Sequence, residues 1–214
     1  MSDYLSRLSD CVFDRWTPKI GDPTLAGWLT VAAYCATAVL ALAIFAQSDG
    51  LPEESRRREM AFWLCVFLAM AALGVNKQLD LQSFGTALGR CVSKLGGWYE
   101  RRQTVQVVGV LALLAAVLAG GCAVVQMMRG LLRRYALAIA GLVFIGAFVL
   151  VRAVGFTHLD ALIHFSIQNG RMNLALELGG VILLAAGAAR ILASCAFGAA
   201  SQKVRDDGPP PSAS

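Results

Sequence analysis

Charged residues are scarce in this chain, and that shortage excludes most soluble folds. Only 15% of the 214 residues are Asp, Glu, Lys or Arg, whereas 57% are hydrophobic. Soluble domains carry about 25% charged residues. The mean hydropathy of +0.61 likewise indicates a protein that resides in a bilayer. The net charge of +5 does not indicate nucleic-acid binding, because the basic residues flank the apolar runs, where they set membrane topology.

Most signatures of catalysis and cofactor binding are also missing. The chain has no C-x-x-C, no G-x-S-x-G, no phosphate-binding glycine loop and no repeat of the transporter kind. Its two histidines are His158 and His164. Asp160 and His164 have the i, i+4 spacing of a ligand pair, but the spacing matches no specific metal motif. Two histidines on one short loop cannot ligate a haem from facing helices. We therefore expect no cofactor, and no metal site.

Long apolar runs, in contrast, are abundant. A helix needs roughly 20 apolar residues to cross a bilayer, and five runs qualify. They lie at about 24–46, 60–80, 104–126, 136–157 and 173–200. Backbone groups in lipid must be satisfied internally, which favours helices. The sequence predicts an all-α polytopic membrane protein with five transmembrane helices. Arg190 interrupts the last run and is expected to snorkel toward an interface.

The bundle at 24–200 is flanked by an N-terminal segment, 1–23, and a polar, proline-rich tail, 201–214, that we expect to be disordered. Apolar residues at helical spacing predict an amphipathic interfacial helix in the N-terminal segment and another around 84–98. Small residues four apart predict close helix packing in a compact bundle. Examples are Ala33-Thr37-Ala41 and Ala112-Ala116-Gly120.

Five spans put the two termini on opposite sides of the membrane. We call the side bearing the N-terminus the N-terminal face and the other side the C-terminal face. Lys and Arg outside the spans number eight on each face. The basic residues closest to helix ends, "RRR" at 56–58 and "RGLLRR" at 129–134, are on the C-terminal face. Because short flanking loops set orientation, we expect the C-terminal face to be cytoplasmic and the N-terminus outside.

Polar residues collect at the N-terminal face. The second span ends in "NKQLD", the fourth ends in "RAVGFTHLD", and the fifth begins with "NLALE". Lys77 and Asp80 have i, i+3 spacing and are expected to neutralise each other. A charged side chain at mid-bilayer costs about 2.5–3.5 kcal/mol on insertion scales. Several such residues at one depth are most simply accommodated if they face one another or a wet cavity.

Two interpretations of this cluster remain open. In the first, it forms a polar pocket that binds or processes a small or lipid-like ligand. The acid–base or ligand-binding candidates are Asp80, His158, Asp160 and Glu177, and the binding candidates are Asn76, Lys77, Gln78, Arg152 and Asn173. In the second, the protein is a structural or accessory subunit whose polar residues lock helices or dock a membrane-protein partner. Whether it is an enzyme stays open. A carrier or channel is disfavoured, since no polar path reaches the C-terminal face.

Four of the six cysteines lie in the spans, where they behave as small apolar residues. Cys11 and Cys91 share the N-terminal face outside the spans. They could pair only if that side is oxidising, and the sequence leaves this open.

Three blocks, "NKQLDLQ", "RAVGFTHLD" and "LELGG", resemble those of a family of small multi-pass bacterial membrane proteins without characterised activity. The resemblance covers most of the chain from the second span onward and implies a polytopic fold in the bacterial inner membrane. Thr157 stands where another histidine would be expected, which further weakens a metal site. Some relatives carry the label isopropylmalate isomerase, the name of a soluble iron–sulfur enzyme, and no residue here supports that activity.

Overall fold

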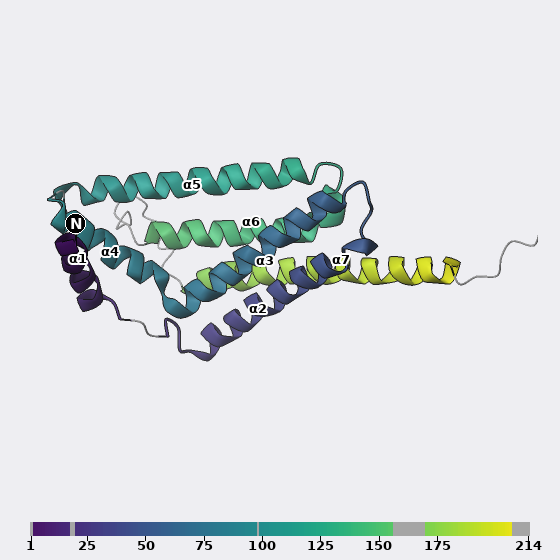
Figure 1. Ribbon diagram of the computed structural model, residues 1–214, viewed down its shortest axis with the longest axis horizontal. Helices are drawn as coiled ribbons and strands as arrows, with labels where there is room; N and C mark the ends of the chain where they lie inside the picture. The colour runs from purple at the N-terminus through teal and green to yellow at the C-terminus, as the bar shows by residue number, and fades with distance from the viewer. Residues whose placement is uncertain (1, 18–19, 98, 156–169, 207–214) are drawn as a thin grey trace, which may run out of the picture.

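The computed structural model describes residues 2–17, 20–97, 99–155 and 170–206, and in these ranges it contains only helices and their connections (Figure 1). The elements are α1 (Ser2–Arg15), α2 (Leu25–Ala46), η1 (Ser48–Gly50), α3 (Arg56–Leu79), α4 (Leu81–Leu95), η2 (Tyr99–Arg101), α5 (Arg102–Met127), α6 (Leu132–Gly155) and α7 (Gly170–Asp206). Five of them, α2, α3, α5, α6 and α7, are long and apolar enough to cross a membrane. The predicted all-α polytopic fold is confirmed.

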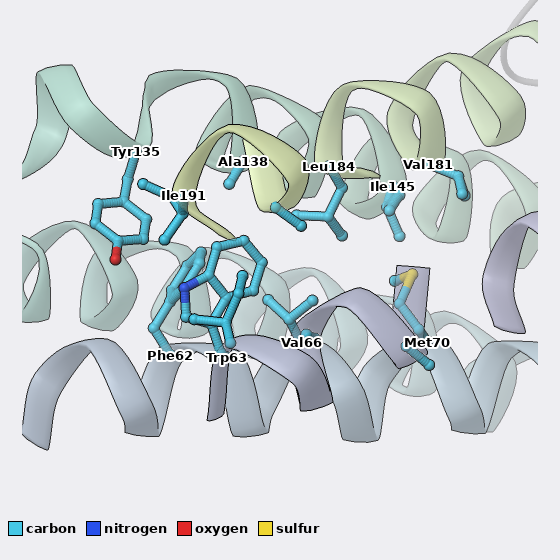
Figure 2. Close-up of a cluster of buried hydrophobic side chains, with 14 of the residues drawn as sticks. Phe62, Trp63, Val66, Met70, Tyr135, Ala138, Ile145, Val181, Leu184 and Ile191 are labelled. Carbon is cyan, nitrogen blue, oxygen red and sulfur yellow. The ribbon is translucent and has the colours of Figure 1, made fainter. Parts of the chain in front are cut away.

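Four of the long helices form the core. Helix α2 packs against α3 and α7, and α6 packs along α7. The buried side chains of α3 recur every three or four residues, so they line one helical face. Figure 2 shows Phe62, Trp63, Val66 and Met70 of this face opposite residues of α6 and α7. Those opposing residues are Ala138, Ile145, Val181, Leu184 and Ile191.

Helices α6 and α7 lie close together at several glycines. A Cβ on Gly141 would lie 2.7 Å from the carbonyl oxygen of Gly180, and a Cβ on Gly187 would lie 2.8 Å from the backbone nitrogen of Ala138. Either side chain would collide with backbone. These glycines allow the close packing of α6 and α7, and the expected stripe Ala33-Thr37-Ala41 packs against the core from α2.

Helix α5 lies outside this core. It runs along α6 (Figure 1), and none of its spanning residues is buried. The stripe Ala112-Ala116-Gly120, expected to pack against another helix, is exposed, and a Cβ on Gly120 would meet open space. The sequence-based expectation was wrong here, because small residues permit close approach but do not select a partner.

The two amphipathic helices lie together at the N-terminal face (Figure 1). A disulfide joins Cys11 of α1 to Cys91 of α4, with the Cα atoms 6.0 Å apart. The ring of Trp16 packs edge-on against Phe84 at a centroid distance of 4.9 Å. Asp80 adopts a left-handed conformation, φ 47°, between the end of α3 and the start of α4. This residue therefore turns the chain out of the bundle into the α1–α4 layer.

At the other end, α7 continues to Asp206, so residues 201–206 are helical where the sequence predicted a disordered tail. Residues 207–214 lie outside the described ranges. In Figure 1 this part of α7 extends beyond the other helices.

Candidate functional site

A buried carboxylate joins three helices at the N-terminal end of the core. The ammonium of Lys77 on α3 lies 2.9 Å and 3.2 Å from the two carboxylate oxygens of Glu177 on α7. The hydroxyl of Tyr34 on α2 donates to Oε1 of Glu177 at 2.9 Å. Glu177 is 3% exposed and Tyr34 is 1% exposed. We call Tyr34, Lys77 and Glu177 the buried trio.

The buried trio continues the apolar faces of the same helices. Along α7, the buried residues Val181, Leu184, Ala188 and Ile191 follow Glu177 at helical spacing. Since Glu177 occupies the next core position toward the N-terminal face, it must point inward. A buried carboxylate is tolerated only when it is paired and hydrogen-bonded, which Lys77 and Tyr34 accomplish here.

A second carboxylate approaches Lys77 from the segment before α2. Oδ2 of Asp22 lies 3.7 Å from the ammonium of Lys77. The backbone N–H and the hydroxyl of Thr24 both donate to Oδ1 of Asp22, at 3.2 Å and 2.6 Å. These bonds, above all the one from the hydroxyl, hold the pKa of Asp22 below its ordinary value of 3.8, with a smaller contribution from Lys77. Thr24 also caps α2, because its hydroxyl accepts from the N–H of Gly27.

The segment before α2 is also tied to the end of α3. The N–H of Gly21 donates to the carbonyl oxygen of Gln78 at 2.8 Å. A Cβ on Gly21 would lie 2.7 Å from the carbonyl oxygen of Lys77, so only glycine allows this approach. Asp22 is thereby held beside Lys77.

A polar cavity of about 220 Å³ lies beside Lys77, at the junction of these segments. We call it the chamber. Its walls are Gly21, Asp22, Lys77, Asp80, Ser83 and Arg152. Two carboxylates and two cations therefore surround one small space. Among the described residues no group of three His, Cys, Asp or Glu side chains could hold a metal ion. The chamber is chemically suited to a group that carries charges of both signs, or several hydrogen-bonding atoms.

An apolar groove of about 510 Å³ runs between α2 and α3. Tyr34 and Ala38 line it from α2, and Met70, Gly74 and Gln78 line it from α3. The amide nitrogen of Gln78 is buried, and no hydrogen-bond partner for it exists among the described residues. Consecutive residues of α3 line the two cavities, Lys77 the chamber and Gln78 the groove.

The structure brings together several of the residues singled out from the sequence. Lys77, Asp80 and Arg152 line the chamber, and Glu177 binds Lys77 directly. Asn76 does not line the chamber. His158, Asp160 and the side chain of Asn173 lie outside the described part of the chain.

The expected pairing of Lys77 with Asp80 is replaced by contacts of Lys77 with Glu177 and Asp22. The reason is that α3 ends at Leu79. Asp80 turns out of the helix instead of following Lys77 on its surface.

Sequence reasoning missed two members of the site. Tyr34 is 143 residues from Glu177 and lies within a run read only as apolar. A tyrosine hydroxyl in a span needs a hydrogen-bond partner, and this requirement could have indicated that Tyr34 contacts a polar residue of another helix. Asp22 was not among the residues singled out from the sequence. Its position just before an N-cap threonine predicts local structure but not its contact with Lys77.

A second buried carboxylate, also missed, lies at the C-terminal face. Glu59 of α3 is fully buried. It accepts hydrogen bonds from the hydroxyls of Ser55, at 2.5 Å, and Tyr135 of α6. The guanidinium of Arg134 lies 3.9 Å from it. A tyrosine, a glutamate and a cation thus meet at each end of α3. Glu59 went unnoticed because it directly follows the "RRR" run, which was interpreted as a topology signal.

No protein-family model matches the chain, and neither a curated protein nor a solved structure matches it. Its function must therefore be inferred from the contacts described above.

Proposed function

We propose that this integral membrane protein binds a small or lipid-like ligand in the chamber at its N-terminal face. The observation that carries the proposal is the gathering of Asp22, Asp80, Lys77 and Arg152 around one cavity. Charged groups near a bilayer are costly, and those within a membrane protein usually mark functional sites. Asp80 and Arg152 are the candidate ligand contacts from the sequence, and the buried trio would hold Lys77 in position.

A second candidate function is supported by the completeness of the Lys77–Glu177 contact. Both oxygens of Glu177 already face Lys77, and Tyr34 donates to one of them. Such a contact can join α2, α3 and α7 without any ligand. In this alternative the protein is a structural or accessory membrane subunit.

We further propose that the N-terminal face is outside the cytoplasm, in a bacterial inner membrane. The Cys11–Cys91 bond supports this orientation, because disulfides persist in oxidising compartments and are rare in the cytosol. The basic residues that flank the spans at the opposite face support it independently. The ligand would then reach the chamber from outside or from the outer leaflet.

The test of ligand binding uses the full chain purified in mild detergent. Compounds released on denaturation are identified by mass spectrometry for the unaltered protein, for Ser83→Phe and for Gly89→Phe. Ser83 lines the chamber, whereas Gly89, on the same helix, is exposed with open space around it. We expect a compound that is retained by the unaltered protein and by Gly89→Phe and is lost from Ser83→Phe.

If no released compound depends on Ser83, ligand binding is refuted and the structural alternative stands. Thermal unfolding of both variants identifies any loss that is due to misfolding.

Orientation is tested with single added cysteines, Asp3→Cys and Ser212→Cys, and a membrane-impermeant maleimide applied to intact cells. Labelling at position 3 but not at 212 is expected. The reverse pattern would refute the orientation.

A further inference from the structure

We propose that the apolar groove and the chamber are two parts of one site, and that its ligand is a zwitterionic aminophospholipid. An acyl chain would lie in the groove between α2 and α3, and the head group would lie in the chamber. This inference rests on the proposed function and names the class of ligand that the chamber would take.

The first argument is the position of the groove. From Gln78 to Met70 it extends ~12 Å along α3 at about 1.5 Å per residue, so it reaches from the N-terminal face toward the middle of the span. Its rim is open to the bilayer, since Val39 is 65% exposed and Val75 is 50% exposed. In a bilayer, lipid chains would occupy the space in front of this rim. A soluble compound would have to cross hydrocarbon to enter it.

The second argument is the charge of the chamber. Asp22 and Asp80 oppose Lys77 and Arg152, so two negative and two positive groups surround the cavity. Asp22 is already held by Lys77 and Thr24, but no ion pair to Asp80 occurs among the described residues, and a purely anionic head group would supply none. A head group with an ammonium and a phosphate can match both signs at once. The same chemistry is present in a free phosphoamine, and the experiment therefore includes one.

The third argument is the amide of Gln78 at the junction. Its nitrogen is buried without a partner among the described residues. Buried donors are nearly always satisfied. A lipid ester carbonyl between the head group and the chain would lie at this level and could accept its hydrogen bond. Gln78 thereby links the polar and apolar parts of the same ligand.

The experiment is native mass spectrometry of the full chain in detergent, titrated with phosphatidylethanolamine, phosphatidylglycerol or water-soluble glycerophosphoethanolamine. The matched variants are Ala71→Phe, which fills the groove, and its neighbour Ala72→Phe, which does not line it. Both alanines are exposed, so both phenylalanines face the bilayer side of α3. Ala71→Leu is a milder second variant, and thermal unfolding verifies the fold of each.

We expect one phosphatidylethanolamine per chain and no comparable binding of the other two compounds. Ala71→Phe should weaken this binding at least about tenfold, which corresponds to ~1.4 kcal/mol. Ala71→Leu should weaken it less, and Ala72→Phe should leave it unchanged. Equal binding of phosphatidylglycerol would refute the zwitterionic head group. Equal binding of phosphatidylethanolamine by Ala71→Phe and Ala72→Phe would refute the placement of the acyl chain in the groove.

Failure of this inference is distinguishable from failure of the proposed function. Suppose that glycerophosphoethanolamine or another soluble compound binds, and that its binding is lost in Ser83→Phe but unchanged in Ala71→Phe. The chamber then binds a ligand, and the lipid assignment is wrong. If no compound depends on either residue, both proposals are refuted.

Discussion

Lys77 and Glu177, 100 residues apart in the sequence, form an ion pair of 2.9 Å between α3 and α7. The Lys77 side chain is 13% exposed and that of Glu177 is 4% exposed. Removal of Lys77 leaves the buried charge of Glu177 without a cation, which typically costs about 3–5 kcal/mol, whereas removal of Glu177 leaves Lys77 beside Asp22. This contact is therefore both the centre of the candidate site and a determinant of stability.

Breaking the pair should destabilise the protein strongly. We expect Lys77→Met to lower the free energy of unfolding by about 3–5 kcal/mol, Glu177→Met to lower it less because Asp22 remains beside Lys77, and the double variant to lose less than the sum of the two. The control is Asp3→Asn, which breaks the exposed pair with Arg7 and should change stability by less than about 1 kcal/mol. Denaturant unfolding in detergent measures these changes. Additive effects of the two single changes would contradict the pairing.

The hydroxyl of Tyr135 should stabilise the opposite end of the core. Tyr135→Phe leaves one oxygen of the buried Glu59 without this donor, and the expected cost is about 1–3 kcal/mol. Tyr4→Phe is the matched control, since Tyr4 is 43% exposed. Thermal unfolding compares the two variants. An equal effect of both changes would show that Glu59 does not depend on Tyr135.

The approach of α6 to α7 should not tolerate a side chain at Gly141. A methyl group there would lie 2.7 Å from backbone atoms of α7, and overpacking typically costs about 1–3 kcal/mol. Gly120→Ala on α5 meets open space and should be neutral or slightly stabilising, because alanine favours helix over glycine. Unfolding midpoints in one detergent provide the comparison. A neutral Gly141→Ala would mean that the two helices are farther apart.

Asp22 should titrate below its ordinary range. The hydrogen bonds from Thr24 favour its ionised form, so this residue stabilises the fold above pH 3.8. That contribution is lost as the pH falls through the lowered pKa. In Thr24→Val the pKa of Asp22 should rise toward 3.8, and α2 should lose its cap. Carboxyl-carbon NMR of labelled aspartate follows the titration, and an unchanged pKa would refute the role of Thr24.

The disulfide should hold α1 against α4 without determining the five spans. In Cys11→Ser, limited proteolysis should release residues of α1 while the membrane-embedded fragment stays intact. The single change leaves Cys91 free, so a thiol-reactive polyethylene glycol should add one label compared with the oxidised protein. Cys35→Ser, which removes an unpaired thiol, is the control. Identical proteolysis of both variants would contradict the tethering role.

The five spans were predictable because each depends only on a local property, the length of an apolar run. The inward direction of Glu177 could also be inferred, since a short carboxylate inside the start of a span lacks the reach to snorkel to the interface. The partner of Glu177 was not accessible from local properties. It depends on the direction in which Lys77 leaves α3 and on the end of that helix at Leu79.

The positions at which helices contact one another could not be predicted from the sequence either. Gly141 and Ala112 are both small residues in apolar runs, yet one packs against α7 and the other is exposed. Only the arrangement of all the helices distinguishes them. The pairing of Cys11 with Cys91 likewise required α1 and α4 to be neighbours, which no sequence pattern specifies.

The two tyrosine–glutamate–cation clusters restrain α3 at both of its ends. Glu59 and Lys77 are ~27 Å apart along the helix at about 1.5 Å per residue, and each is bonded to a different neighbour. Axial sliding of α3 would break both clusters together, so the clusters oppose movement of the helix along its axis. Among the described residues of α2, Tyr34 alone bonds to these clusters, and the segment before α2 is tied to the end of α3 through Gly21 and Asp22. Separation of α2 from α3 would therefore have to break the contacts of Tyr34, Gly21 and Asp22 at the N-terminal face.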